Sequence, residues 1–199
     1  MIILGIDPGT ATTGYGLVKI KNRKLKMNYP SLKRRGIPSG ASSFGGSHPH
    51  PKGRGVPAAK IKNNLKCLDY GLIKTSPSLV TPDRLKKINN ELTKIIKKYQ
   101  PEIIAVENIY FFKNLKTAIP VSQAKGVILL TAAKKKIPVE EFTPLQMKSI
   151  ITKNGWAKKS EVQKRIKKLL KLKKVPKPDD ASDALGIAIC GALKCAKKI

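Results

Sequence analysis

The chain has 199 residues, in which 41 Lys and Arg outnumber 12 Asp and Glu, so its formal net charge is +29. That length suits one domain with a substantial core. No apolar run reaches eighteen residues, so no membrane partner is expected. The lack of a signal peptide and of metal-spaced cysteines predicts a cytoplasmic protein with reduced thiols. The charge excess favours a polyanion such as nucleic acid as partner, although a chain that uses lysine on every solvated face gives the same excess.

The first predicted element is a buried strand that ends on an acid. Residues 2–6 form a nearly continuous apolar run, as expected of a strand covered on both faces, and Asp7 follows them. Residues 8–10 suit a turn and residues 14–20 resume as a strand, so the segment predicts a hairpin. A carboxylate at the end of a buried strand needs a metal ion, a cation or backbone donors beside it. Asp7 is therefore a candidate metal ligand, with simple capping of its own turn as the alternative.

Residues 23–63 interrupt the strands that follow. The segment holds ten Lys or Arg, no Asp or Glu, six Gly, five Pro and five Ser, and such a composition buries too little apolar surface to offset its ordering entropy. The tetrapeptide KIKN occurs at residues 19–22 and again at residues 60–63. Removal of 41 residues between the two copies joins the flanking strands as an ordinary hairpin. We therefore predict an irregular insertion at a hairpin tip, and the alternative is a basic arm that tracks phosphates.

A second predicted strand also ends on an acid. Apolar residues at helical spacing predict a helix over residues 82–99, and residues 103–106 then form a short buried strand before Glu107. If the two strands are parallel neighbours, Asp7 and Glu107 lie within metal-sharing distance. A helix terminus or a lysine partner is the alternative for Glu107. Tyr110 and Lys113 follow in an aromatic loop and are candidates for contact with DNA, unless the aromatic residues pack in the core.

The C-terminal part adds helices, a strand and two further acids. Helices are predicted at residues 117–136 and 144–151, a strand at 137–142, and a basic helix within 153–174. Ser160 is the expected cap of the basic helix, where Lys158 and Lys159 suit a grip on phosphate unless they belong to a solvated lysine face. Asp180 and Asp183 are three residues apart at the start of a last helix, so both face one side of its first turn. Simple capping of this helix is the alternative for Asp179 or Asp180.

Four acids at two strand ends and one helix start, without a cluster of Cys or His, specify hard cations with oxygen ligands, Mg²⁺ or Mn²⁺. Two such ions about 3.5 to 4 Å apart activate a water, orient a phosphodiester and stabilise its leaving oxygen. Lysines around the site supply phosphate binding and charge stabilisation. Together with the basic composition, these acids predict a metal-dependent nuclease.

Five motifs carry a resemblance to a known family: ILGIDPGTATTGYG, AVENIYFFKN, QAKGV, AKKSEVQ and DDASDAL. In this order they resemble the RuvC family of bacterial Holliday junction resolvases, of the ribonuclease H-like superfamily, over nearly the whole chain apart from residues 23–63. The resemblance implies one α/β domain, residues 1–199, with a mixed five-stranded sheet flanked by helices. It implies that the catalytic and metal-binding carboxylates are Asp7, Glu107, Asp180 and Asp183. The expected DNA-binding residues are Tyr110, Lys113, Lys148, Lys158 and Lys159.

The same resemblance implies an activity and its partners. The expected reaction is the resolution of four-way DNA junctions by paired symmetric cuts in homologous recombination and DNA repair, which leaves 5′-phosphate and 3′-hydroxyl ends. Expected cofactors are two Mg²⁺ ions per subunit during catalysis, with Mn²⁺ as the alternative. A homodimer and the branch-migration proteins RuvA and RuvB are the expected partners. The insertion at residues 23–63 departs from the family pattern.

Other functions remain open at the level of the sequence. An ATPase of the actin and sugar-kinase type also has Asp, Gly and Thr in this order, but it needs a second such hairpin and a Gly-rich adenosine site, and 199 residues show neither. A catalytically silent junction-binding protein would not require all four acids. A general nuclease for single strands or RNA:DNA hybrids is compatible with the same periodicity.

Overall fold

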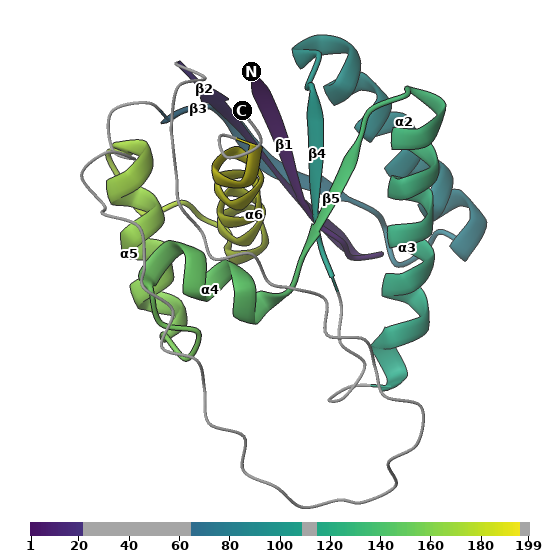
Figure 1. Cartoon of the computed structure of the whole chain (residues 1–199). Coiled ribbons are helices and arrows are strands. Elements are labelled where there is room, and N and C mark those ends of the chain that lie inside the picture. The colour runs from purple at the N-terminus through teal and green to yellow at the C-terminus, as the bar shows by residue number, and fades with distance from the viewer. Residues whose placement is uncertain (22–64, 109–114, 196–199) are drawn as a thin grey trace, which may run out of the picture.

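The computed structural model describes residues 1–21, 65–108 and 115–195. Its centre is a five-stranded sheet with the order β3-β2-β1-β4-β5. The strands are β1 (Ile2–Asp7), β2 (Thr12–Ile20), β3 (Leu65–Lys74), β4 (Ile103–Glu107) and β5 (Val139–Phe142). The first three strands are antiparallel, whereas β4 runs parallel to both β1 and β5. The mixed five-stranded sheet expected from the sequence is thus confirmed (Figure 1).

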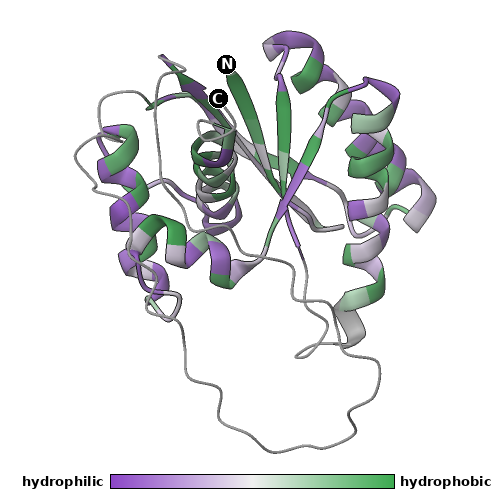
Figure 2. Cartoon of the chain, in the orientation of Figure 1, coloured by the Kyte–Doolittle hydropathy of each residue, from purple (hydrophilic) through white to green (hydrophobic). Residues whose placement is uncertain are grey.

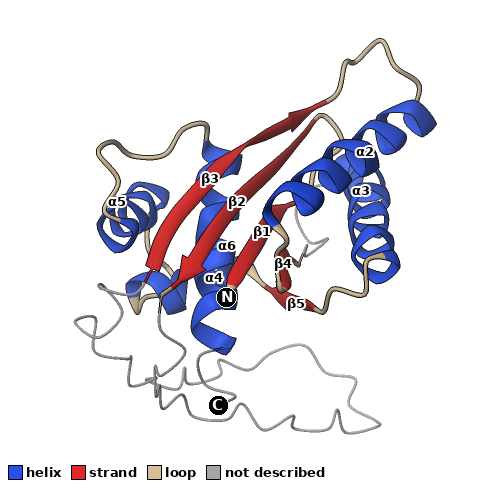
Figure 3. Ribbon diagram, turned by 90° about the horizontal axis from the view of Figure 1, so that it is seen from above, coloured by secondary structure: helices blue, strands red, loops and turns tan. Residues whose placement is uncertain are grey.

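Helices cover both faces of this sheet. The helices are α2 (Thr81–Tyr99), α3 (Leu115–Lys134), α4 (Pro144–Thr152), α5 (Lys159–Leu170) and α6 (Asp179–Cys195). Seen from above, α6 passes behind β1 and β2 while α2 crosses in front of the sheet (Figure 3). The core is accordingly divided in two, with α4, α5 and α6 packed on one face and α2 and α3 on the other. None of the helices in the described ranges is both long and apolar enough to cross a bilayer.

The helix that carries the last two acids is the most deeply buried. Almost every residue of α6 after its first turn is inaccessible to solvent, including Leu185, Ile187 and Ile189. In contrast, α2 and α5 alternate apolar and charged stripes, as helices on a protein surface do (Figure 2). A helix that is apolar all round must be enclosed, so α6 is held firmly against the sheet at the point where its first turn meets β1.

Most expected elements occur within a few residues of the predicted bounds, with one clear exception at a helix start. Ser160 does not cap α5: the N-cap is Lys158, and Ser160 lies inside the helix. The backbone N–H of Lys158 donates to Glu161 Oε2 at 2.9 Å, so the acid three residues after the cap satisfies this end of the helix. The insertion expected at residues 23–63 lies outside the described residues.

Candidate active site

The ends of β1 and β4 bring two acids side by side. These strands are parallel, with Ile6 opposite Val106, so Asp7 and Glu107 occupy neighbouring positions where the strands end. The two side chains are partly buried and share a hydrogen bond. A hydrogen bond between two carboxyl groups requires that one of them carries a proton, so the neighbouring Glu107 favours the protonated form of Asp7 and raises its pKa.

Glycines on β1 and β2 bring the other two acids to this strand end. A Cβ on Gly5 would lie 2.1 Å from the carbonyl oxygen of Ala184, and a Cβ on Gly14 would lie 2.2 Å from that of Asp180. Both distances are far below van der Waals contact, so only glycine lets the α6 backbone lie directly on the strands. The first turn of α6 therefore stands beside Asp7, and the negative charges of Asp180 and Asp183 both act on its pKa.

A threonine and a lysine hold these two acids. Thr12 Oγ1 donates to Asp180 Oδ2 at 2.7 Å, from the start of β2. Lys159 Nζ, at the start of α5, lies 3.1 Å from Asp183 Oδ2 and 3.4 Å from Asp179 Oδ2. The exposed fraction of the Asp183 side chain is 19%, so the lysine partly offsets the cost of enclosing this charge.

Asp179 fixes the lysine from the other side. Its carboxylate accepts from Gln163 Nε2 at 2.9 Å and pairs with Lys177 Nζ at 3.3 Å. The hydrogen bond from Gln163, and after it the contacts with Lys177 and Lys159, hold the pKa of Asp179 below its ordinary value. Asp179 thus anchors α5 to the first turn of α6, which gives Lys159 a defined position near the acids.

Burial dominates the protonation of the acids. Withdrawal from solvent, followed by the negative charge of Glu107, raises the pKa of Asp7 to about 9. Burial also raises the pKa of Glu107, which the hydrogen bond with Asp7 opposes, and the pKa of Asp183, which Lys159 opposes. Carboxylates with raised pKa values in one place are unfavourable as a charged set, so a bound cation would stabilise them strongly.

The donor set fits a hard divalent cation. All the ligands would be carboxylate oxygens, which suits Mg²⁺ or Mn²⁺ and disfavours metals that require thiolate or imidazole. In the arrangement of the described residues, no three Asp, Glu, His or Cys side chains form a ready metal cage. A cation at this site would compete with Lys159 for Asp183, whose Oδ2 lies 3.1 Å from the lysine Nζ.

A second lysine braces the residue after Glu107. Lys125 Nζ, from α3, donates to Asn108 Oδ1 at 2.9 Å and to Glu141 Oε2 at 2.7 Å. The backbone N–H of Asn108 donates to the Phe142 carbonyl at 2.7 Å. The exposed fraction of the Lys125 side chain is 16%. This lysine therefore joins α3 to the ends of β4 and β5 just beyond Glu107.

The expected DNA-binding residues divide into three groups. Lys159 contacts the acids directly. No hydrogen bond or ion pair among the described residues joins Lys148 or Lys158 to the acids, and Lys158 is exposed. Tyr110 and Lys113 lie outside the described residues.

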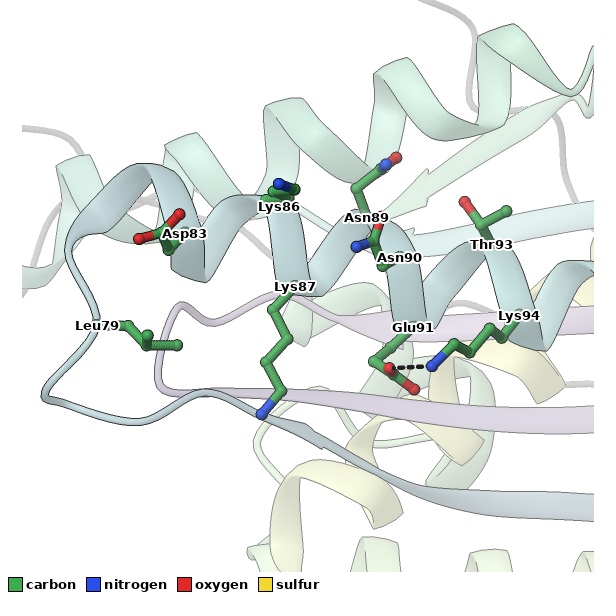
Figure 4. Close-up of a pocket in the computed structure, with 9 residues that line it drawn as sticks. All are labelled: Leu79, Asp83, Lys86, Lys87, Asn89, Asn90, Glu91, Thr93 and Lys94. Carbon is green, nitrogen blue, oxygen red and sulfur yellow. Dashed lines mark hydrogen bonds and ion pairs between the residues drawn. The ribbon is translucent and has the colours of Figure 1, made fainter.

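Sequence reasoning missed several residues that shape the site: Gly5, Thr12, Lys125, Gln163 and Asp179, the last of which was assigned only to capping. Thr12 offered a signal, since it follows Asp7 by only five residues in the predicted hairpin. A surface pocket among the described residues lies elsewhere, along the exposed side of α2 between Leu79 and Lys94 (Figure 4). Its one internal ion pair joins Glu91 to Lys94 at 2.7 Å, and none of the four acids lines it.

Comparison with known proteins gives a consistent result. The family model described as crossover junction endodeoxyribonuclease RuvC matches residues 51–191. Curated proteins of that name from Desulforamulus reducens and Alkaliphilus oremlandii are 40% and 41% identical over 192 residues, which covers 96% of this chain and 93% of each relative. Among solved structures, T. thermophilus RuvC in complex with Holliday junction substrate is 26% identical, with a TM-score of 0.75 and coverage of 100% of this chain and 96% of the other.

Proposed function

The chain belongs to the crossover junction endodeoxyribonuclease RuvC family, and from this premise we propose that it resolves four-way DNA junctions by paired, symmetric strand cuts in homologous recombination and DNA repair. The products are ends with a 5′-phosphate and a 3′-hydroxyl. One observation carries the proposal: Asp7, Glu107 and Asp183 converge at the end of two parallel strands, partly buried and with raised pKa values, beside a lysine.

The proposed catalytic residues are the four acids, which hold two divalent cations, Mg²⁺ or alternatively Mn²⁺. When bound, these ions supply an activated water and charge stabilisation at the leaving oxygen. Asp7 and Glu107 would present carboxylate oxygens to these ions from the ends of β1 and β4. Thr12 keeps Asp180 turned toward Asp7 through its 2.7 Å hydrogen bond.

Lys159 has two roles in this proposal. Its ammonium group balances the charge of Asp183 at a distance of 3.1 Å. In the presence of substrate, the same group lies close enough to the acids to stabilise the negative charge that develops on the phosphate. Lys148 and Lys158, with Tyr110 and Lys113, are proposed to contact DNA farther from the cut.

The remaining proposals concern assembly and location. We propose a single nuclease domain over residues 1–199, interrupted at about residues 23–63, that acts as a homodimer, because two symmetric cuts need two active sites. RuvA and RuvB are proposed partners and the cytoplasm the proposed location, both by family membership. The excess of basic residues supports a DNA substrate.

The decisive experiment compares a synthetic four-way junction with a linear duplex of the same sequence, each with Mg²⁺ or with EDTA. Paired nicks at symmetric positions only in the junction, and only with Mg²⁺, are expected. Asp7→Asn should retain junction binding and lose cleavage. Hydrolysis of ATP without DNA cleavage would favour an actin-like ATPase. Junction binding without cleavage by the wild-type chain would favour a catalytically silent binding protein. Equal cutting of single strands or RNA:DNA hybrids would favour a general nuclease.

A further inference from the structure

The turn between α4 and α5 presents a large aromatic side chain to solvent. Trp156 has an exposed fraction of 75%, the highest among the large hydrophobic residues of the described chain. Trp156 is also the only tryptophan in the sequence. Such an exposed indole offers a large, flat apolar face with a polar N–H at its edge, which suits contact with another ring.

The backbone around Trp156 is fixed from both sides. Asn154 Oδ1 accepts from the backbone N–H of Trp156 at 3.0 Å, and the backbone carbonyl of Asn154 accepts from Thr152 Oγ1 at 2.8 Å. On the following side, Ala157 is only 3% exposed. A Cβ on Gly155 would lie 2.8 Å from Ser149 Oγ and within 3 Å of a Leu145 methyl group, so the turn lies flush on α4. The indole therefore projects from a held support, which lowers the entropy lost when it meets a ligand.

This turn stands at the rim of the proposed active site. Trp156 precedes Lys159 by three residues, which span at most about 11 Å, and Lys159 Nζ lies 3.1 Å from Asp183. In Figure 1 the α4–α5 connection lies at the lower end of the molecule, from which α6 rises. Exposed Lys153 and Lys158 flank the tryptophan in the chain. An exposed aromatic side chain that is flanked in the sequence by lysines, three residues before a lysine that contacts Asp183, suits a polyanion that also carries flat apolar rings.

We propose that Trp156 is a stacking platform for a base of the junction DNA, adjacent to the strand that is cut. Every base has an aromatic face, so such contact tolerates any sequence, while the neighbouring lysines bind the phosphates on either side. A protein partner is disfavoured because it would have to desolvate these lysines to reach the indole. The inference rests on the proposed function, since it assigns the DNA a second point of contact at the same site.

The wild-type chain is its own reporter, because Trp156 is the only tryptophan. The full chain is titrated with a synthetic four-way junction in EDTA, where no cleavage occurs, and tryptophan emission is excited where tyrosine does not absorb. A gel shift on the same samples measures binding independently. Stacking predicts that emission is quenched in proportion to the complex and that acrylamide loses access to the indole. A complex in the gel without any change in emission or accessibility overturns the inference alone, whereas the absence of a complex overturns the proposed function and the inference with it.

Variants test the energetic role. Trp156→Ala should weaken junction affinity about five- to tenfold, while Trp156→Phe, which keeps an aromatic face, should stay within about twofold of wild type. Leu130→Ala is the matched control, since Leu130 is 55% exposed on α3 and should leave affinity unchanged. Circular dichroism establishes that each variant is folded. Wild-type affinity and cleavage in folded Trp156→Ala, the result expected if the indole served a protein partner, would refute the proposal, as would equal losses for the Ala and Phe variants.

Discussion

At the scale of single residues, the acids of this site work against the stability of the fold. Asp7 and Glu107 are enclosed at a strand end, and burial raises the pKa of both. Lys159 offsets part of the cost at Asp183. The proposed function requires these charges to be close together, whereas folding favours their separation or neutralisation. Removal of one acid from the metal-free protein should therefore stabilise it.

Asp7→Asn tests this expectation. Because the pKa of Asp7 in the folded chain is raised to about 9, from an ordinary value of about 3.9, the folded state binds more protons than the unfolded state between these limits. Its contribution to stability is complete below about pH 4 and is lost as the pH rises toward about 9. We expect Asp7→Asn in EDTA to raise the free energy of unfolding by about 2 kcal/mol at pH 8 and by little at pH 4.

Urea unfolding at the two pH values measures the effect, and exposed Asp83 on α2 supplies the control variant Asp83→Asn, for which no gain at pH 8 is expected. Added Mg²⁺ should stabilise the wild type more than Asp7→Asn, because the variant lacks one ligand. A variant less stable than wild type at pH 8 in EDTA would show that Asp7 is not a source of strain.

A second prediction at this scale concerns Lys125, which we expect to position Glu107 indirectly, through its contact with Asn108. Lys125→Met removes the donor to Asn108 and Glu141 and should cost about 1 to 2 kcal/mol of stability, because the two acceptors lose their partner. We expect the cleavage rate at saturating junction to fall several-fold with affinity nearly unchanged, and Lys125→Arg to recover most of it. Lys134→Met, at the exposed end of the same helix, is the control. A loss confined to affinity would assign Lys125 to DNA binding instead.

At the scale of elements, the sequence predicts what is local and leaves open what depends on contact between distant segments. The strand-end pattern before Asp7 and Glu107 sufficed to predict both strands, because an apolar run that ends on an acid is a property of consecutive residues. The docking of α6 was not predictable: Gly5 reads as a weak point in a strand until a helix backbone is known to lie on it. Ser160 was chosen wrongly as a cap because two consecutive lysines before it gave no signal of the helix start at residue 159.

The contact of α6 with β2 gives a prediction for this scale. Gly14→Ala places a methyl group 2.2 Å from the Asp180 carbonyl oxygen, so the first turn of α6 must move away from β2. We expect a loss of about 1 to 3 kcal/mol in the free energy of unfolding and a fall of at least about a hundredfold in cleavage, because misplacement by about 1 Å is costly.

Gly126→Ala provides the matched control on α3. A Cβ there meets nothing within 4 Å, and alanine is the better helix former, so the variant should gain about 0.5 to 1 kcal/mol and cleave as wild type. Thermal melts and junction cleavage on both variants decide the matter. Full activity in Gly14→Ala would mean that the acids of α6 need not be held against β2.

At the scale of the whole molecule, the sheet itself indicates how the chain tolerates residues 23–63. β2 ends at Ile20 and β3 begins at Leu65, and these two residues are direct partners in the antiparallel register. The 44 residues between them therefore leave and re-enter the sheet at one point. No strand pairing of the described chain would be lost if a short turn replaced them.

Deletion of residues 23–63 leaves Lys21, Asn22 and Asn64 between the paired residues Ile20 and Leu65, a three-residue connection of ordinary hairpin length. We expect the shortened chain to fold, with stability equal to wild type or higher by up to about 2 kcal/mol, because a long loop costs more entropy to close. Metal-dependent cutting of four-way junctions should persist, since the four acids and Lys159 lie at the opposite ends of β1 and β2 from this turn.

The salt dependence of DNA binding should become shallower if the ten Lys and Arg of the segment contact phosphates. A second variant that keeps the length but replaces these ten residues with Gln separates charge from chain length. Loss of junction cutting in the deletion would refute the view that the segment is surplus, and its loss in the Gln variant as well would assign the segment to DNA binding.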